Sequence, residues 1–165
     1  MRYFLIFVLF CSPAFADTVR PVPSQFRYAM SDLRQPIASH KRKIHLNPKS
    51  LKIMNDGVNK VDFVSNQLVY KKDAYWATER EFFNWGGECR DYAVEKYRLL
   101  RRAGVPDANM QIVVGYLKTG ELHAILSVTD ENNIYVLDNQ DNVIRDNTYK
   151  LKVIYTLNRI AWRLK

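Results

Sequence analysis

The sequence contains no internal repeat, no low-complexity tract and no apolar run long enough to span a bilayer. Its first apolar run, Tyr3 to Phe10, is far shorter than the roughly 20 residues of a transmembrane helix. These absences exclude repeat architectures and membrane-embedded proteins. The composition, 47% hydrophobic and 25% charged, is typical of a globular chain, and 165 residues are enough for one domain with its own core.

The first 16 residues have the pattern of a secretory signal peptide. A short positive start, Met1-Arg2, precedes the apolar run, and Ala14-Phe15-Ala16 is a small-x-small cleavage site. We therefore expect cleavage after Ala16 and a periplasmic location. A lipoprotein interpretation at Cys11 is the weaker alternative, because Phe10 fits poorly before a lipidated cysteine.

Cysteine is scarce: the chain has two, and Cys11 leaves with the signal peptide, so the mature protein keeps only Cys89. A lone cysteine in an oxidising compartment cannot form an internal disulfide, which leaves two interpretations. Cys89 is either a buried apolar filler or a reactive thiol. The sequence around it, Trp85-Gly86-Gly87-Glu88-Cys89, favours the second, because a helical pattern begins at Cys89 and a helix start stabilises a thiolate.

Acidic residues are fewer than basic ones. The mature chain holds 24 Lys and Arg against 17 Asp and Glu, a net charge of +7. The basic residues form short clusters at 40–43, 71–72 and 101–102, without the interleaved aromatics of a nucleic-acid motif. We interpret these clusters as solvated faces and expect no nucleic-acid partner.

Helical patterns occupy the first half of the chain. Asn47-Pro48 predicts a helix start, with a helix over about 48–64, and Thr78 with Glu81 has the spacing of a capping box. A helix is expected from about 88 to 103, with its apolar residues on one face and its arginines largely on others. Residues 66–70 are expected to be extended. Residues 17–47 remain an N-terminal segment of uncertain structure before a domain at 48–165.

After the last helix the hydrophobic period changes to two residues. The expected strands are 111–117, 121–129, 134–138 and 151–157. Helices followed by an antiparallel meander predict an α+β fold with the cysteine helix packed on the sheet.

The strand pattern supplies a base and an orienting carboxylate for Cys89. If residues 130–133 form the hairpin loop, Thr129 pairs with Ile134 and Ile125 lies opposite Asp138. His123, two residues from Ile125, is then a diagonal neighbour of Asp138 on the same face of the sheet. Cysteine, histidine and aspartate are the nucleophile, general base and orienter of a thiol hydrolase. A satisfied core histidine is the alternative for His123. Trp76 and Asn84 are guesses for a second oxyanion donor beside the Cys89 N–H.

These residues together resemble the bacterial transglutaminase-like cysteine proteinase family over about residues 45–160. The matching segments are Val58–Lys60, Tyr75–Thr78, Glu81-Phe82, Gly86–Ala93, Lys96-Tyr97, Leu100-Arg101, Gly104–Pro106, His123–Leu126, Val136–Asn139 and Ile154–Asn158. The resemblance implies a papain-like, transglutaminase-like fold with the triad on Cys89, His123 and Asp138. It also implies a protein substrate such as a surface adhesin and an inner-membrane regulatory receptor as partners.

The chain departs from that family beside the cysteine. The resemblance implies acidic residues on both sides of the cysteine that contribute to a calcium site. Here Glu88 remains as a weak candidate ligand, but Arg90 cannot bind a cation. We therefore expect no cofactor requirement for the chemistry and doubt a calcium site.

The sequence leaves the reaction partly open. The main hypothesis is an exported cysteine peptidase that works through a thioester acyl-enzyme. The alternatives are a transglutaminase-like or small-molecule acyl transferase, and a silent periplasmic binding module with the same fold.

Overall fold

The computed structural model describes residues 18–33, 45–131, 133–141, 144–145 and 151–165. The helices are α1 (Ser24–Ala29), α2 (Pro48–Val58), α3 (Asn66–Tyr70), α4 (Glu79–Trp85) and α5 (Cys89–Arg102), with a 3-10 turn at Asp107–Asn109. The strands are β1 (Thr18–Arg20), β2 (Met110–Tyr116), β3 (Leu122–Thr129), β4 (Ile134–Leu137), β5 (Ile144–Arg145), β6 (Lys152–Leu157) and β7 (Trp162–Leu164). The predicted signal peptide, residues 1–16, lies outside the described residues. No helix in the described ranges is long and apolar enough to cross a membrane.

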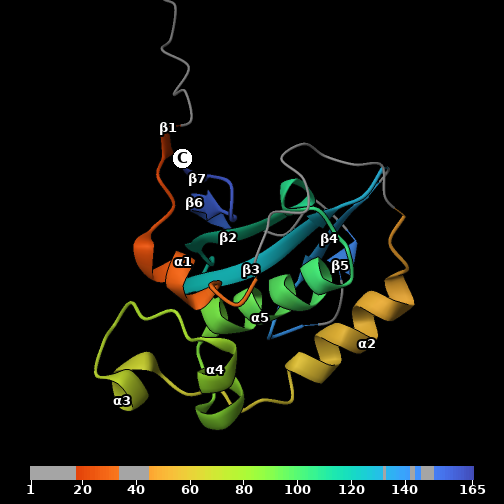
Figure 1. Cartoon of the computed structure of the whole chain (residues 1–165). Helices are drawn as coiled ribbons and strands as arrows, with labels where there is room; N and C mark the ends of the chain where they lie inside the picture. Colours follow the sequence, from red (N-terminus) through yellow and green to blue (C-terminus); the bar gives the residue numbers. More distant parts are fainter. Residues whose placement is uncertain (1–17, 34–44, 132, 142–143, 146–150) are drawn as a thin grey trace, which may run out of the picture.

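The strands form one antiparallel sheet in the order β1-β7-β6-β2-β3-β4-β5. Helix α5 packs on β2 and β3, and α2 and α4 contact α5. Figure 1 shows α5 lying beneath the sheet with α2 and α4 on its outer side. The predicted α+β class is therefore confirmed, and α5 is the helix around which the layers are arranged.

Local sequence signals explain where most helices begin. The Asn47 side chain accepts the Lys49 N–H at 2.9 Å, and Pro48 occupies the first position of α2. Thr78 and Glu81 form the predicted capping box of α4, and Gly86 ends that helix. Helix α2 ends at Val58, six residues before the predicted end.

The prediction that residues 66–70 are extended was wrong, because they form α3. The Ser65 hydroxyl accepts the Leu68 N–H at 3.2 Å, which caps the helix at its start. The apolar pattern of five residues is too short to distinguish a helix from a strand, whereas the serine cap decides the conformation locally.

The interpretation of residues 101–102 as a solvated face was wrong for Arg101, whereas Arg102 is exposed. Arg101 is buried and contacts Asp107 at 3.2 Å, while Arg98 is fully buried beside Glu95 at 2.7 Å. Helix α5 is covered by the sheet on one side and by other segments elsewhere, so Arg98 and Arg101 face protein rather than water.

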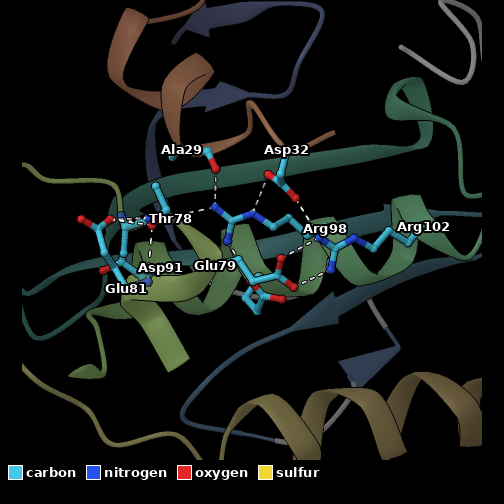
Figure 2. Close-up of polar contacts among 10 residues, drawn as sticks. Ala29, Asp32, Thr78, Glu79, Glu81, Asp91, Arg98 and Arg102 are labelled. Atoms are coloured by element: carbon cyan, nitrogen blue, oxygen red, sulfur yellow. Dashed lines mark hydrogen bonds and ion pairs between the residues drawn. The ribbon is translucent and has the colours of Figure 1, made fainter. Parts of the chain in front are cut away.

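The N-terminal segment reaches this buried helix. Phe26 of α1 is fully buried and meets the Trp76 ring edge-on at 5.3 Å between centroids. Arg98 donates to the carbonyl oxygens of Ala29 and Ala77 and faces Asp32 at 3.6 Å, as Figure 2 shows for Ala29 and Asp32. The described part of residues 17–47 therefore belongs to the same core as α5.

Candidate active site

The Gly-Gly pair before Cys89 lets the chain pass close to a neighbouring segment. Gly86 has a φ of 78°, and a Cβ added to it would lie 2.4 Å from the Asp62 carbonyl oxygen. Gly87 donates to that same oxygen at 3.3 Å, and a Cβ there would lie 2.7 Å from the Asp91 Cβ. Any side chain at either position would push the start of α5 away, so both glycines are structural requirements of the site.

Cys89 is the first residue of α5, as predicted, and it is partly exposed. Glu88 and Asp91 cap this helix: the Asp91 carboxylate accepts the Glu88 N–H at 2.9 Å and the Ala77 N–H at 2.8 Å. The first backbone N–H groups of a helix have no partner within it, and the helix dipole is positive there. This end of α5 therefore favours negative charge on the cysteine sulfur.

The β3–β4 hairpin has the predicted register. Thr129 pairs with Ile134 and Leu126 with Leu137, so the next residue, Asp138, leaves β4 near His123. His123 Nε2 lies 2.8 Å from Asp138 Oδ1, and both side chains are buried. The carboxylate also accepts the Gln140 N–H at 3.0 Å. These contacts fix the imidazole so that Nδ1 is the ring nitrogen left for Cys89.

The surroundings of His123 favour its charged form. Burial alone would lower the pKa of His123, but the hydrogen bonds and negative charges of Asp138 and Cys89 outweigh it and raise that pKa to about 9. The structure therefore brings together Cys89, His123 and Asp138, from α5, β3 and the end of β4. An imidazolium held between a carboxylate and a sulfur is the arrangement that thiol hydrolases use to keep a thiolate ready.

A pocket of about 240 Å³ opens at these residues. Its lining consists of Asp73, Ala74, Glu88, Cys89, Arg90, Val114, Leu122 and His123. A substrate carbonyl placed in this pocket reaches the cysteine from the solvent side. The pocket is where a reacting bond would lie.

The two residues guessed as oxyanion donors have different positions. Trp76 is buried and its ring lies 5.5 Å from the Arg90 guanidinium carbon, so it contacts the pocket lining indirectly. Asn84 is exposed on α4 and does not line the pocket described above. The structure therefore brings Trp76, but not Asn84, next to a residue of the pocket, and the second oxyanion donor stays a prediction.

Sequence reasoning missed how Glu88 is held. Glu88 Oε1 accepts the Asn66 backbone N–H at 2.7 Å, and Oε2 accepts from the Asn66 side chain and from Arg90, both at 3.3 Å. The Arg90 guanidinium also donates to the Asp73 carbonyl oxygen at 2.8 Å. Ser65 is the signal in the sequence that could have indicated a helix start and an ordered Asn66 beside the site, and it was not recognised as a cap.

Comparisons with known proteins show which family and which solved structures the chain is similar to. A family model described as bacterial transglutaminase-like cysteine proteinase matches residues 25–156. Among solved structures, the chain is similar to calcium-bound LapG of Legionella pneumophila, with 26% identity, 87% of this chain and 81% of that chain covered, and a TM-score of 0.61. Another structure of Legionella pneumophila LapG matches with 24% identity over 84% of this chain and 75% of that chain, at a TM-score of 0.60. The curated proteins yielded no match.

Proposed function

The chain belongs to the bacterial transglutaminase-like cysteine proteinase family, and we propose that it is an exported peptidase. In this proposal it cleaves a protein substrate through Cys89, His123 and Asp138. The observation that carries the proposal is the 2.8 Å contact between His123 and Asp138 beside a pocket lined by Cys89. The signal-peptide pattern of residues 1–16 supports export to the periplasm.

Each proposed step follows from one side chain. His123 Nδ1 takes the thiol proton, and the Cys89 thiolate attacks the substrate carbonyl carbon; the Cys89 N–H at the start of α5 donates to the resulting oxyanion. The imidazolium then protonates the leaving amine, which leaves a thioester on Cys89. His123 next takes a proton from water, whose oxygen attacks the thioester carbonyl carbon. The C–S bond then breaks, the carboxylic acid product leaves, and the imidazolium returns its proton to the Cys89 sulfur. Asp138 holds the ring and stabilises its positive charge throughout.

Alkylation of Cys89 by iodoacetamide tests the proposal without knowledge of the substrate. An ordinary thiol is only about 3% ionised at pH 7, so a thiolate stabilised by an imidazolium should react about tenfold faster or more. We expect fast labelling in the wild type and labelling at the rate of a free thiol in His123→Ala. Equal rates in the two proteins, both matching free cysteine, would show that Cys89 is not activated.

The pKa of His123 gives a second prediction. Its value of about 9 exceeds the unfolded value of about 6.5, so the folded protein binds this proton more tightly. The resulting stabilisation is complete below about pH 6.5 and is lost as the pH rises through about 9. NMR titration of histidine-labelled protein should show one histidine with a midpoint near 9, absent from His123→Ala and lowered in Cys89→Ala. A midpoint near 6.5 would contradict the ion pair.

Calcium is bound in one of the similar structures, and we propose that this chain does not need it. Calcium requires six to eight oxygen ligands. Both Glu88 oxygens already accept hydrogen bonds, both Asp91 oxygens accept backbone N–H groups, and the Arg90 guanidinium occupies the space between Glu88 and the Asp73 carbonyl. Within the described ranges, no group of three or more His, Cys, Asp or Glu side chains could hold a metal. The residues present do not fit calcium.

Two measurements check this proposal. Calorimetry of chelator-treated protein with calcium chloride should give no binding heat, and the melting temperature should not change with calcium or chelator. Arg90→Gln should lower the free energy of unfolding by about 1–3 kcal/mol, because it removes charged hydrogen bonds that link Glu88 to residue 73. A calcium-dependent rise in the melting temperature of the wild type would contradict the replacement of a metal by Arg90.

A further inference from the structure

A buried lysine lies on α5 two turns after Cys89 and takes no part in the steps above. Lys96 is fully buried, and within the described part of the chain no atom accepts a hydrogen bond from its Nζ. Its amine lies 5.9 Å from the centre of the Tyr92 ring, one turn earlier on α5. An ammonium removed from water without a hydrogen-bond partner costs free energy, so this position requires a compensating interaction.

The segment after β4, which contains Asp138, is held from α2. Asn59, the C-cap of α2, donates from Nδ2 to the Asp138 carbonyl oxygen at 2.9 Å, and Asn55 donates from Nδ2 to the Asp141 carbonyl oxygen at 2.9 Å. Residues 55 and 59 are one helical turn apart, so both lie on the same face of α2. This face fixes the backbone of Asp138 while its carboxylate meets His123.

Charges near Lys96 come from both neighbouring elements. Its amine interacts electrostatically with Asp138, after β4, and with Asp56, on α2. Burial lowers the pKa of Lys96 to about 7 against the opposing effect of these two carboxylates, so the amine is charged in the acidic range. Tyr92 on α5 presents its ring, and His123 on β3 also faces Asp138. Lys96 on α5 is thus a second positive group that acts on the Asp138 carboxylate, in addition to His123 on β3.

We propose that Lys96 is a positioning residue of the active site: its buried ammonium is a counter-charge that keeps Asp138 ionised, and Asp138 thereby keeps His123 oriented toward Cys89. The inference rests on the proposed function of these three residues. Lys96 does not touch the substrate. It acts through Asp138 and through its field on the cysteine sulfur two turns away on the same helix.

The pH dependence of iodoacetamide labelling distinguishes this role from simple packing. Replacing Lys96 with methionine removes one positive charge, so the thiolate and the Asp138 carboxylate both become easier to protonate. The acidic limb of the labelling profile should move up by about one pH unit, the effect of a single charge roughly 10 Å away at an effective dielectric of about 20. Above pH 7 the wild-type amine is largely neutral, so the profiles should converge there.

Two further variants complete the experiment, each measured as the full-length mature protein with its melting curve. Lys96→Gln, which keeps a polar group without the charge, should shift the limb as Lys96→Met does. Lys60→Met, the same replacement at an exposed lysine just after α2, should leave it in place. If both Lys96 variants fold and keep the acidic limb within about 0.2 pH unit of the wild type, the inference is overturned and Lys96 is packing only.

Failure of the proposed function would look different. In that case His123→Ala would label as fast as the wild type whatever residue stands at 96. If the acidic limb of the labelling profile stays in place in the Lys96 variants while Cys89 is labelled slowly in His123→Ala, only the role of Lys96 is disproved.

Discussion

Replacing His123 with alanine is expected to reduce peptide-bond hydrolysis by about 10⁶-fold, because the ring is both the base that forms the thiolate and the acid that protonates the leaving amine. Cleavage can be measured by mass spectrometry on a peptide library made from a digested bacterial proteome, and kcat on the best peptide found. Cys89→Ala should lose as much activity, and the double variant should lose no more than either single one, because the residues act as a unit.

Asp138→Asn should reduce peptide-bond hydrolysis less than His123→Ala or Cys89→Ala does, by about 10⁴-fold. The amide still fills the space of the carboxylate but no longer selects the histidine tautomer or stabilises the imidazolium. An amide can also donate to Nε2, which would turn the ring proton toward the cysteine. A His123→Ala protein that keeps activity within tenfold of the wild type would exclude histidine as the base. Activity that survives in Cys89→Ala would exclude the cysteine nucleophile.

Replacing Arg98 with methionine is expected to destabilise the fold by about 3–5 kcal/mol, because it leaves the buried Glu95 carboxylate without its cation. The same change removes the donors to the Ala29 and Ala77 carbonyl oxygens. For a chain of this length the melting temperature should fall by roughly 10 °C or more. Thermal unfolding followed by circular dichroism gives the measurement.

Arg102→Met is the matched control, one turn later on the same helix. Arg102 contacts Asp32 at 2.8 Å and pairs with Glu79, as Figure 2 shows, but 43% of its side chain is exposed, so the loss should not exceed about 1 kcal/mol. Replacing Arg98 and Glu95 together with Met and Leu should recover most of the stability lost in the single variant. Equal losses at positions 98 and 102 would show that burial of the ion pair is not what matters.

The sequence was most informative where local chemistry decides the structure. The glycine pair, the Thr78–Glu81 capping box and the Asn47-Pro48 start depend on neighbours within four residues, and the structure contains all of them. The hairpin register also followed from a short loop, and it placed His123 beside Asp138. These predictions needed only the period of the strands and the chemistry of turns.

Other features could not be read from the chain because they depend on distant partners. β1 and β7 are three residues each; β1 pairs with β7, which lies far away in the sequence, and β7 also pairs with β6. The burial of Arg98 could not be read from a helical wheel, which does not reveal that Ala29 and Asp32 contact it from the N-terminal segment. Lys96 matched a family segment, but its burial depends on how the sheet and the other helices pack on α5.

The pairing of β1 with β7 also affects the order in which the sheet can form during folding. Thr18 lies opposite Leu164, so the first described strand pairs with the last one. Contacts this distant in sequence form late, because a long loop must close before they contribute. A growing chain therefore carries Cys89 well before β6 and β7 exist to finish the sheet. The β1 edge of the sheet can therefore form only after β7 has been made.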